Sequence, residues 1–493
     1  GHSGPSGWVV RMAVAAAVAT TVPAHGYEGY TTLAGLTEQA ALQSRLHRRV
    51  VERFALSLGI FEPLRLDPAT LSTDRARNLF VRLSALDAGQ GHAPEVLTRK
   101  GGQSLSPLRQ HVLGWLAAGT VLETHPALRV RHHFVDAKSG AGLRRQPGVT
   151  AAAASTDSVQ QGISSLRQLF SGAAMDGTGL AAPDWIESAD NDLGLTVFGD
   201  AYERAVTAET VAARETALVE ALLSAGAMLA VLEQVGDPAY VHNDLHAVLA
   251  GRYSSYVAEH YGRAGVPQPD LKLELAPPQR FRDLVFDGKG GGLAERTAQS
   301  YLSTDSISRK VLPAGTKLVG QGGYLSTPWA KHWLAWTQQR ASEEGESSHS
   351  ALFLDDRCFA DYASALLPAV GKFAQVGLDF LLRGDLRLSF STESGLVIKL
   401  LDEQLGSGNL TVLGEKASGE RIVLKTLSTL PSRPGVLGTV PLSEESVKDY
   451  VRLVVLWKGR DHNGQHLVTS SQLGLRKTEP VAPAAPAPEA ASE

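Results

Sequence analysis

The sequence contains very little cysteine, so disulfide bonds cannot stabilise the fold. Cys358 is the only cysteine among 493 residues. A single thiol cannot form the intramolecular disulfides on which small secreted domains often depend. The hydrophobic content of 43% is ample for apolar cores. We therefore expect packing alone to hold the protein together.

An excess of positive charge is also missing. The chain carries 47 Lys and Arg against 51 Asp and Glu, a net charge of -4. Nucleic-acid-binding proteins usually carry a basic patch, and this composition shows no such signature. The Gly-x-Ser-x-Gly elbow of serine hydrolases is absent, and Gly290–Gly292 is not followed by the Lys-Ser/Thr of a phosphate-binding loop.

The apolar run near the start of the chain is too short to span a bilayer. Met12–Val22 is apolar and Ala-rich, and Val22 and Ala24 suit the −3 and −1 positions of a signal-peptidase site. This pattern predicts a signal peptide over residues 1–24 and an exported protein, periplasmic or extracellular, whose mature chain begins at His25. An ordinary Ala-rich helix is the alternative. We expect no transmembrane helix in the rest of the chain.

Helical periodicity dominates the chain up to residue 383. The apolar positions predict helices over Leu36–Leu58, Leu108–Leu122, Val211–Val235 and Phe359–Arg383. A short alternation over Val311–Thr327 suggests a hairpin inside this helical part.

At Asp385 the period changes from helical to alternating. Short alternating runs, separated by Gly- and Pro-rich turns, continue to Ser471, and Asn463-Gly464 is a strong hairpin signal. The fold class predicted is therefore multidomain α plus β: an all-α domain over 25–383, then an antiparallel β-sandwich over 384–476. Residues 477–493 are rich in Pro and Ala and are expected to be disordered.

Potential metal ligands gather where the longest apolar helix ends. Glu233, Asp237, His242 and His246 lie within fourteen residues. Glu233 and Asp237 are four residues apart, a spacing that places two carboxylates on one face of a helix. Imidazole and carboxylate are ligands that hold zinc. The plain alternative is a set of ordinary polar residues at a junction between helix and loop.

Two segments resemble the superfamily of zinc-dependent phospholipases C and fungal single-strand nucleases. Gly119–Thr124 followed by His132–Asp136 is similar to its Gly-Ala-type helix with an acidic residue and its His-Phe-Tyr-Asp segment. Glu233–Asp244 resembles its second ligand helix, and Leu36–Ala40 resembles the start of its N-terminal helix. Gly292–Thr297, Leu354–Tyr362 and Arg383-Gly384 are similar to segments of an exported bacterial branch that ends in a β-sandwich.

The resemblance implies a helical domain with a zinc cluster that hydrolyses a phospholipid or another phosphodiester. It implies His25, His133, Glu233, Asp237, His242 and His246 as metal ligands, with Asp237 and Glu123 as candidate catalytic residues. The cluster would polarise a phosphodiester oxygen and lower the pKa of a bound water. Leu122–Asp136 and Leu218–Gly262 would then be the two halves of one site.

The sequence departs from the family at several ligand positions. Thr124 stands where the family has a ligand Asp, and Glu233 stands where it has a His. Tyr240 or His242 occupies the place of a further His, depending on the alignment. Two functions therefore stay open: a zinc-dependent phosphodiester hydrolase, and a catalytically degenerate exported binding or scaffold protein whose β-sandwich contacts a protein or surface partner.

Overall fold

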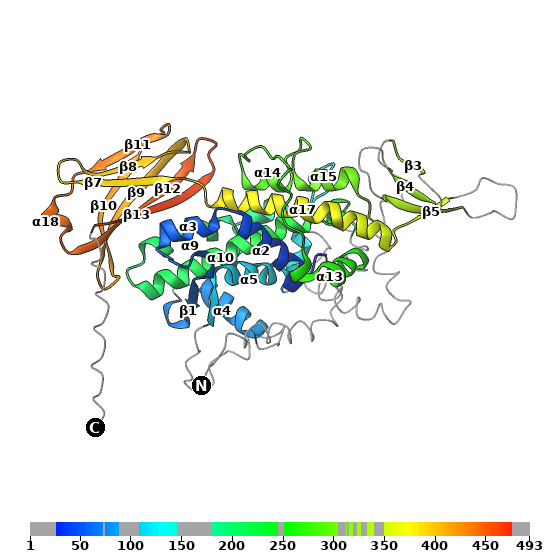
Figure 1. The fold of residues 1–493 in the computed structure, drawn as a ribbon, viewed down its shortest axis with the longest axis horizontal. Helices are drawn as coiled ribbons and strands as arrows, with labels where there is room; N and C mark the ends of the chain where they lie inside the picture. The colour runs from blue at the N-terminus through cyan, green and yellow to red at the C-terminus, as the bar shows by residue number, and fades with distance from the viewer. Residues whose placement is uncertain are drawn as a thin grey trace, which may run out of the picture.

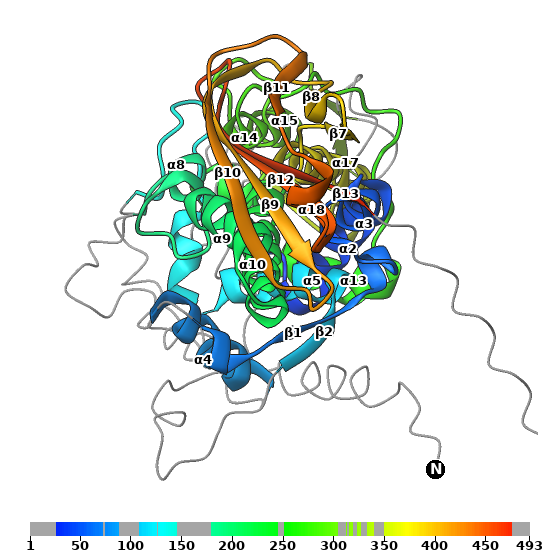
Figure 2. The same cartoon turned by 90° about the vertical axis from the view of Figure 1, so that its left-hand side faces the viewer.

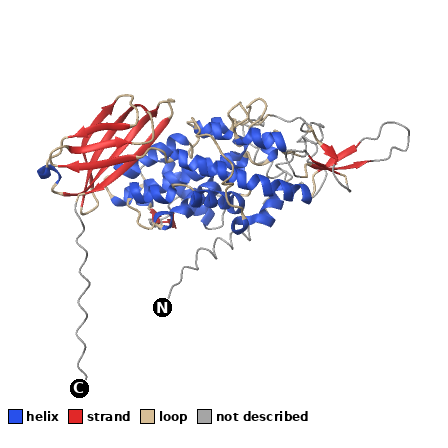
Figure 3. Cartoon of the chain, turned by 45° about the horizontal axis from the view of Figure 1, so that its top comes forward, coloured by secondary structure: helices blue, strands red, loops and turns tan. Residues whose placement is uncertain are grey.

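Helices fill the larger, N-terminal part of the chain and antiparallel strands fill its C-terminal part, so the expected α plus β class is confirmed at that level (Figures 1 and 3). The predicted signal peptide and C-terminal tail lie outside the described residues and stay predictions. The computed structural model describes residues 26–71, 74–87, 108–125, 127–144, 179–244, 251–303, 312, 315–318, 323–326, 333–339 and 350–475.

The helical part is built around α10 (Val211–Gln234), which is buried along nearly its whole length. Helices α5 (Val112–Thr124), α9 (Leu195–Thr207) and α17 (Asp356–Leu381) pack on it (Figure 1). The backbones of α5 and α10 touch where two glycines meet, since a Cβ on Gly226 would lie 1.9 Å from the carbonyl oxygen of Leu116. Only glycine permits this close crossing.

By length and composition α10 would also qualify as a membrane-spanning helix, which the sequence analysis did not expect. It is the one such helix within the described residues. In the fold, 94% of its most apolar window is buried by protein. Packing on all sides therefore accounts for a helix that is apolar all round.

The remaining helical segments surround this core. They are the π-helical turn Gly29–Leu33, α2 (Ala34–Gln43), α3 (Leu46–Phe54), α4 (Asp74–Asp87), the 3₁₀ turns Gly59–Phe61, Pro68–Thr70 and Ala127–His132, α8 (Ala182–Glu187), α11 (Pro238–Val241), α13 (Arg252–Gly265), α14 (Phe281–Val285) and α15 (Leu293–Ser300). The short helix α18 (Glu444–Val447) lies instead in the C-terminal part of the chain (Figure 1).

Two predicted helices are interrupted in the structure. The helix expected over Leu36–Leu58 breaks at Ser44, which is extended and whose hydroxyl accepts a hydrogen bond from the backbone N–H of Leu46. The helix expected from Leu108 begins only at Val112, because residues 108–111 form strand β2. In both places a local polar contact or strand pairing overrides the helical pattern.

The C-terminal part contains two antiparallel sheets in the orders β10-β9-β12-β13 and β11-β8-β7. Side chains from both sheets, including Ile398, Val412 and Trp457, form one apolar core, so the sheets stack as the sandwich that the alternating pattern predicted. Their strands are β7 (Leu386–Ser391), β8 (Gly395–Leu400), β9 (Leu405–Lys416), β10 (Arg421–Thr429), β11 (Gly435–Val440), β12 (Tyr450–Asp461) and β13 (His466–Gly474).

Strand β11 was not predicted, because Gly435 and Gly438 interrupt its apolar alternation. The hairpin at Asn463-Gly464 is present: it joins β12 to β13, and Gly464 has φ +76°. Within the helical part, a further antiparallel sheet has the order β3-β4-β5-β6, and its first pair lies within the predicted hairpin over 311–327. With the pair β1-β2, it shows that residues 25–383 are not all-α as expected. Two of its strands were not predicted. The small sheets comprise β1 (Pro63–Leu66) with β2 (Leu108–His111), and β3 (Lys317–Leu318), β4 (Tyr324–Ser326), β5 (Ala335–Gln339) and β6 (Ser350–Phe353).

The larger sheet of the sandwich is covered on both faces. Alternate residues of β9 and β12 point either into the sandwich or toward the helices, where Leu413, Val454 and Leu456 join the core of the helical part. Helices α3 and α9 lie against this outer face (Figure 2). Burial on both faces explains why Leu453–Trp457 is a continuous apolar run.

Candidate functional site

The two segments that the sequence analysis joined into one site do lie together. The backbone N–H of Val135 donates to the carbonyl oxygen of Tyr240 at 3.1 Å, and that of Ala137 donates to Val241 at 3.2 Å. Phe134 and Tyr240 also share a small apolar cluster. The segment after α5 is therefore held directly against the segment after α10.

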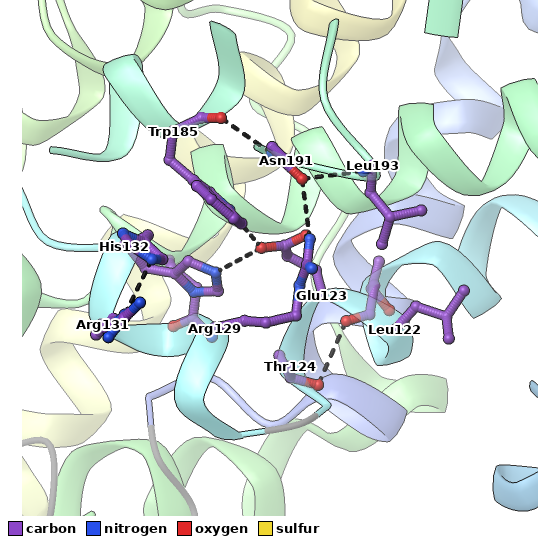
Figure 4. Close-up of polar contacts among 12 residues, drawn as sticks. Leu122, Glu123, Thr124, Arg129, Arg131, His132, Trp185, Asn191 and Leu193 are labelled. Carbon is purple, nitrogen blue, oxygen red and sulfur yellow. Dashed lines mark hydrogen bonds and ion pairs between the residues drawn. The ribbon is translucent and has the colours of Figure 1, made fainter. Parts of the chain in front are cut away.

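Glu123, in the last turn of α5, is the centre of a buried polar network (Figure 4). Its Oε1 atom accepts hydrogen bonds from Nε2 of His133 at 3.0 Å and from the indole N–H of Trp185 at 2.8 Å. Its Oε2 atom accepts one from Arg129 at 2.7 Å. Glu123 and His133 are fully buried. The carboxylate is thus bonded to side chains from two other parts of the chain, the segment 129–133 and α8.

A second layer of contacts holds Arg129 in place. Its guanidinium also donates to Asp192 at 2.7 Å and to the Asn191 side-chain oxygen at 2.9 Å. Arg82, on α4, pairs with the other oxygen of Asp192 at 3.0 Å and donates to the carbonyl oxygen of Leu122 at 2.7 Å. The network therefore connects α4, α5 and the loop after α8.

The charges in this network keep Glu123 ionised. Burial alone would raise the pKa of its carboxyl, but the Arg129 guanidinium and the hydrogen bond from His133 lower it to about 2. A carboxylate in this state cannot act as a general acid at neutral pH. It is also already satisfied by its three donors.

The neighbouring His132 serves a packing role. Its ring stacks on Trp185 with the ring centroids 4.2 Å apart, and its Nδ1 accepts a hydrogen bond from the backbone N–H of Leu180 at 2.9 Å. Burial, followed by the nearby Arg131 charge, lowers its pKa to about 3. His132 is therefore neutral at physiological pH.

Glu233 and Asp237 do not share a helix face, which corrects the expectation from their spacing. Helix α10 ends at Gln234, and Asp237 instead caps α11 by accepting from the backbone N–H of Ala239 at 3.0 Å. The turn at Gly236 separates them. Glu233 accepts from the Thr37 hydroxyl at 2.7 Å, while its Oε2 atom has no hydrogen-bond partner among the described residues.

The surroundings of both carboxyls raise their pKa values and so favour the protonated, neutral form. Burial raises the pKa of Glu233 well above its ordinary value. Burial, with a smaller contribution from the nearby Asp244, raises the pKa of Asp237 to about 7. Zinc needs deprotonated ligands, so these environments as they stand do not supply a strong anionic site.

The remaining candidate ligands are dispersed or undescribed. His242 ends α11, and its Nε2 contacts the carbonyl oxygen of Tyr301 at 2.8 Å. Asn243 follows with φ +53°, so the helix does not continue past His242. His25 and His246 lie outside the described residues.

Within the part of the chain that the structure describes, no group of three or more His, Cys, Asp or Glu side chains could hold a metal ion. The charge of the Glu123 carboxylate is balanced by Arg129. Glu233, on α10, accepts from Thr37, whereas Asp237 caps α11. Three buried atoms of the two segments, Nδ1 of His133, Oε2 of Glu233 and the hydroxyl of Tyr240, do lack partners among the described residues. The described donors therefore do not fit a cluster of several zinc ions.

The structure adds residues that the sequence analysis missed. Tyr27 forms a paired contact with the Gln234 amide, donating through its backbone N–H and accepting through its carbonyl oxygen, each at 3.0 Å. Arg129 and Trp185 are the other unexpected members of the site. Arg129 follows Glu123 by six residues, but no sequence motif links Glu123, Arg129 and Trp185.

Comparison with known proteins does not extend this picture. No family model, curated protein or solved structure matches this chain. The resemblance to the zinc phospholipase C superfamily therefore rests on the motifs quoted above.

Proposed function

We propose that this chain is an exported binding or scaffold protein with a fold like that of the zinc phospholipase C superfamily and without that family's complete zinc cluster. The observation that carries the proposal is the set of three hydrogen bonds on Glu123, one of them from the Arg129 guanidinium. A metal at this carboxylate would have to displace a buried cation that also pairs with Asp192.

The number of available ligands supports the same conclusion. Catalytic zinc sites usually have three protein ligands and an open position for water. In the described residues the free candidate atoms are Nδ1 of His133 and Oε2 of Glu233, whereas the Glu123 carboxylate is fully bonded. Two such atoms are fewer than the three ligands of a catalytic zinc site. The polar centre then acts as an internal brace between α5 and α8.

The rigid connection to the sandwich favours a scaffold. Arg421 donates from the sandwich to the carbonyl oxygen of Val206 at 2.7 Å, and the hydroxyls of Tyr202 and Ser470 lie 2.9 Å apart. Together with the shared apolar core, these contacts fix the sandwich on the helices. A fixed sandwich presents a constant surface to a protein or surface partner.

A zinc-dependent phosphodiester hydrolase is the second candidate, and one observation favours it. His133 bonds a carboxylate through Nε2 and leaves Nδ1 buried without a partner in the described residues. Metal-binding histidines commonly bond a carboxylate through the nitrogen that faces away from the metal. His25, the residue before the described segment, would have to complete such a site.

Metal analysis of the purified chain after zinc loading and dialysis separates the two candidates. We expect no stoichiometric zinc, and no hydrolysis of bis(p-nitrophenyl) phosphate in the presence of zinc. His133→Ala should leave the metal content unchanged, as should the control His260→Ala at an exposed surface position. Several zinc ions per chain, lost in His133→Ala and retained in His260→Ala, would refute the proposal and support the hydrolase.

A further inference from the structure

A polar pocket lies where α3 meets the edge of the sandwich. Its volume is about 350 Å³, and its walls come from α3, β7, β12 and β13. Figures 1 and 2 both place α3 beside β13. The size falls in the range of small-molecule sites, roughly 300–1,000 Å³. The pocket uses none of the residues around Glu123.

The lining of this pocket is strongly cationic. Arg49, Arg53, Arg387 and Arg452 line it, against two carboxylates, Glu52 and Asp385. Two positive charges therefore remain in excess at the walls, although the whole chain is acidic. Such a local excess attracts a dianion.

Arg49 is the central observation, because it is a buried guanidinium that is incompletely bonded. The residue is only 3% exposed, and its Nε atom has no hydrogen-bond partner among the described residues. Its ion pairs with Asp385, Glu52 and Asp402 span 3.7 to 3.9 Å, longer than hydrogen bonds. Burial and the neighbouring Arg53 charge lower the pKa of Arg49. An anion in the pocket would satisfy this group.

Arg53 adds a second buried positive charge. It is 2% exposed and donates to the carbonyl oxygens of Leu382 at 2.8 Å and Gly384 at 2.5 Å. In the part of the chain described, no carboxylate forms an ion pair with it, so its charge is not neutralised locally. The rim arginines are already paired: Arg387 with Asp385 and Arg452 with Glu415, each at 3.0 Å.

The opposite wall offers further polar groups. The side-chain oxygen of Gln472 is buried without a partner among the described residues. Because amide oxygen and nitrogen exchange places by rotation of the last torsion, Gln472 can present its N–H groups to the pocket instead. Ser471 also lines this wall.

We propose that this pocket binds a small molecule that bears a phosphate monoester. Planar guanidinium groups match phosphate oxygens in two-point hydrogen bonding. A phosphate monoester carries about −1.5 to −2 charge at neutral pH, which matches the excess of two positive charges at the walls. The proposal stands apart from the question of zinc, since the two sites share no residue.

Calorimetric titration of the full chain with inorganic phosphate and with glycerol 3-phosphate, at constant ionic strength, tests the proposal. We expect saturable binding that chloride does not reproduce. Arg49→Gln should weaken it by roughly tenfold or more, as expected for loss of a charge-assisted hydrogen bond. Arg280→Gln is the matched control, because Arg280 is an exposed arginine paired with Asp283 outside the pocket.

Arg387→Gln protects the test against misfolding of the Arg49 variant, since the Arg387 side chain is 50% exposed. It should also weaken binding. Cosedimentation with phosphatidic acid vesicles identifies the source of the phosphate: Arg49-dependent vesicle binding supports a lipid headgroup, and binding of the soluble ligands alone supports a free metabolite. Absence of saturable binding in every arm, or equal binding by wild type and both pocket variants, would overturn the proposal.

Discussion

Replacing Glu123 by Gln tests whether the buried network is a structural brace. The wild-type pKa of about 2, against the ordinary 4.5, corresponds to about 3 kcal/mol of stabilisation at 1.36 kcal/mol per pKa unit. The single oxygen of Gln can accept either from His133 and Trp185 or from Arg129, and its N–H₂ group then faces the remaining donors. Loss of one partner in a buried ion pair costs about 3–5 kcal/mol, and we expect the lower end because Asp192 still bonds Arg129.

The assay is denaturant unfolding with calorimetry at several pH values. Because the folded pKa of Glu123 lies below the unfolded value, its contribution is present above about pH 5 and is lost as the pH falls toward 2. Glu123→Gln should lack that part of the pH dependence. Glu187→Gln is the matched control. The Glu187 side chain is 30% exposed, and its ion pair with Arg282 should contribute less than about 1 kcal/mol to the free energy of unfolding.

Equal unfolding free energies for Glu123→Gln and Glu187→Gln would refute the brace. A loss of bound zinc in Glu123→Gln with unchanged stability would assign Glu123 to a metal site instead.

Two further predictions concern α10 and the turn that follows it. Gly226→Ala should destabilise the protein by about 3 kcal/mol or more, because its Cβ would overlap the Leu116 carbonyl oxygen. Gly199→Ala, whose Cβ would meet nothing within 4 Å, should be neutral or stabilising. Thermal unfolding of the two variants measures the difference, and equal midpoints would contradict the close crossing of α5 and α10. Asp237 has a folded pKa of about 7, so wild-type stability should fall as the pH rises from about 4 to 7. Asp237→Asn keeps an acceptor for the Ala239 N–H and should flatten this fall, and an unchanged pH profile of the thermal midpoint would show that the carboxyl is not responsible.

Much of the fold could be predicted because buried apolar residues recur at the period of the helix or strand that carries them. The change from helical to alternating pattern after residue 383 marked the start of the strands, and Asn463-Gly464 fixed one hairpin. Periodicity did not predict the structure where local contacts or strand pairing decided the conformation. Ser44 broke a continuous helical pattern through its own side chain, and residues 108–111 became a strand because a partner strand lay beside them.

The contact between the two segments was predicted, but the partners of their side chains were not. The motifs correctly brought the segment after α5 to the segment after α10. They could not show that Glu123 would be bonded to Arg129 and Trp185, because Trp185 is 62 residues away along the chain. A sequence motif can identify candidate ligands, but it does not show which partner each side chain bonds in the folded protein.

The sequence by itself determined the order of the elements, the apolar cores and the types of ionisable side chain that enter the interior. These follow from local periodicity and from the cost of exposing apolar surface. Only the tertiary structure decided how buried charges are paired: Glu123 directly with Arg129, and Arg49 only with carboxylates 3.7 to 3.9 Å away. The strength of a charge interaction depends on distance and burial, and both are set only when distant segments pack together.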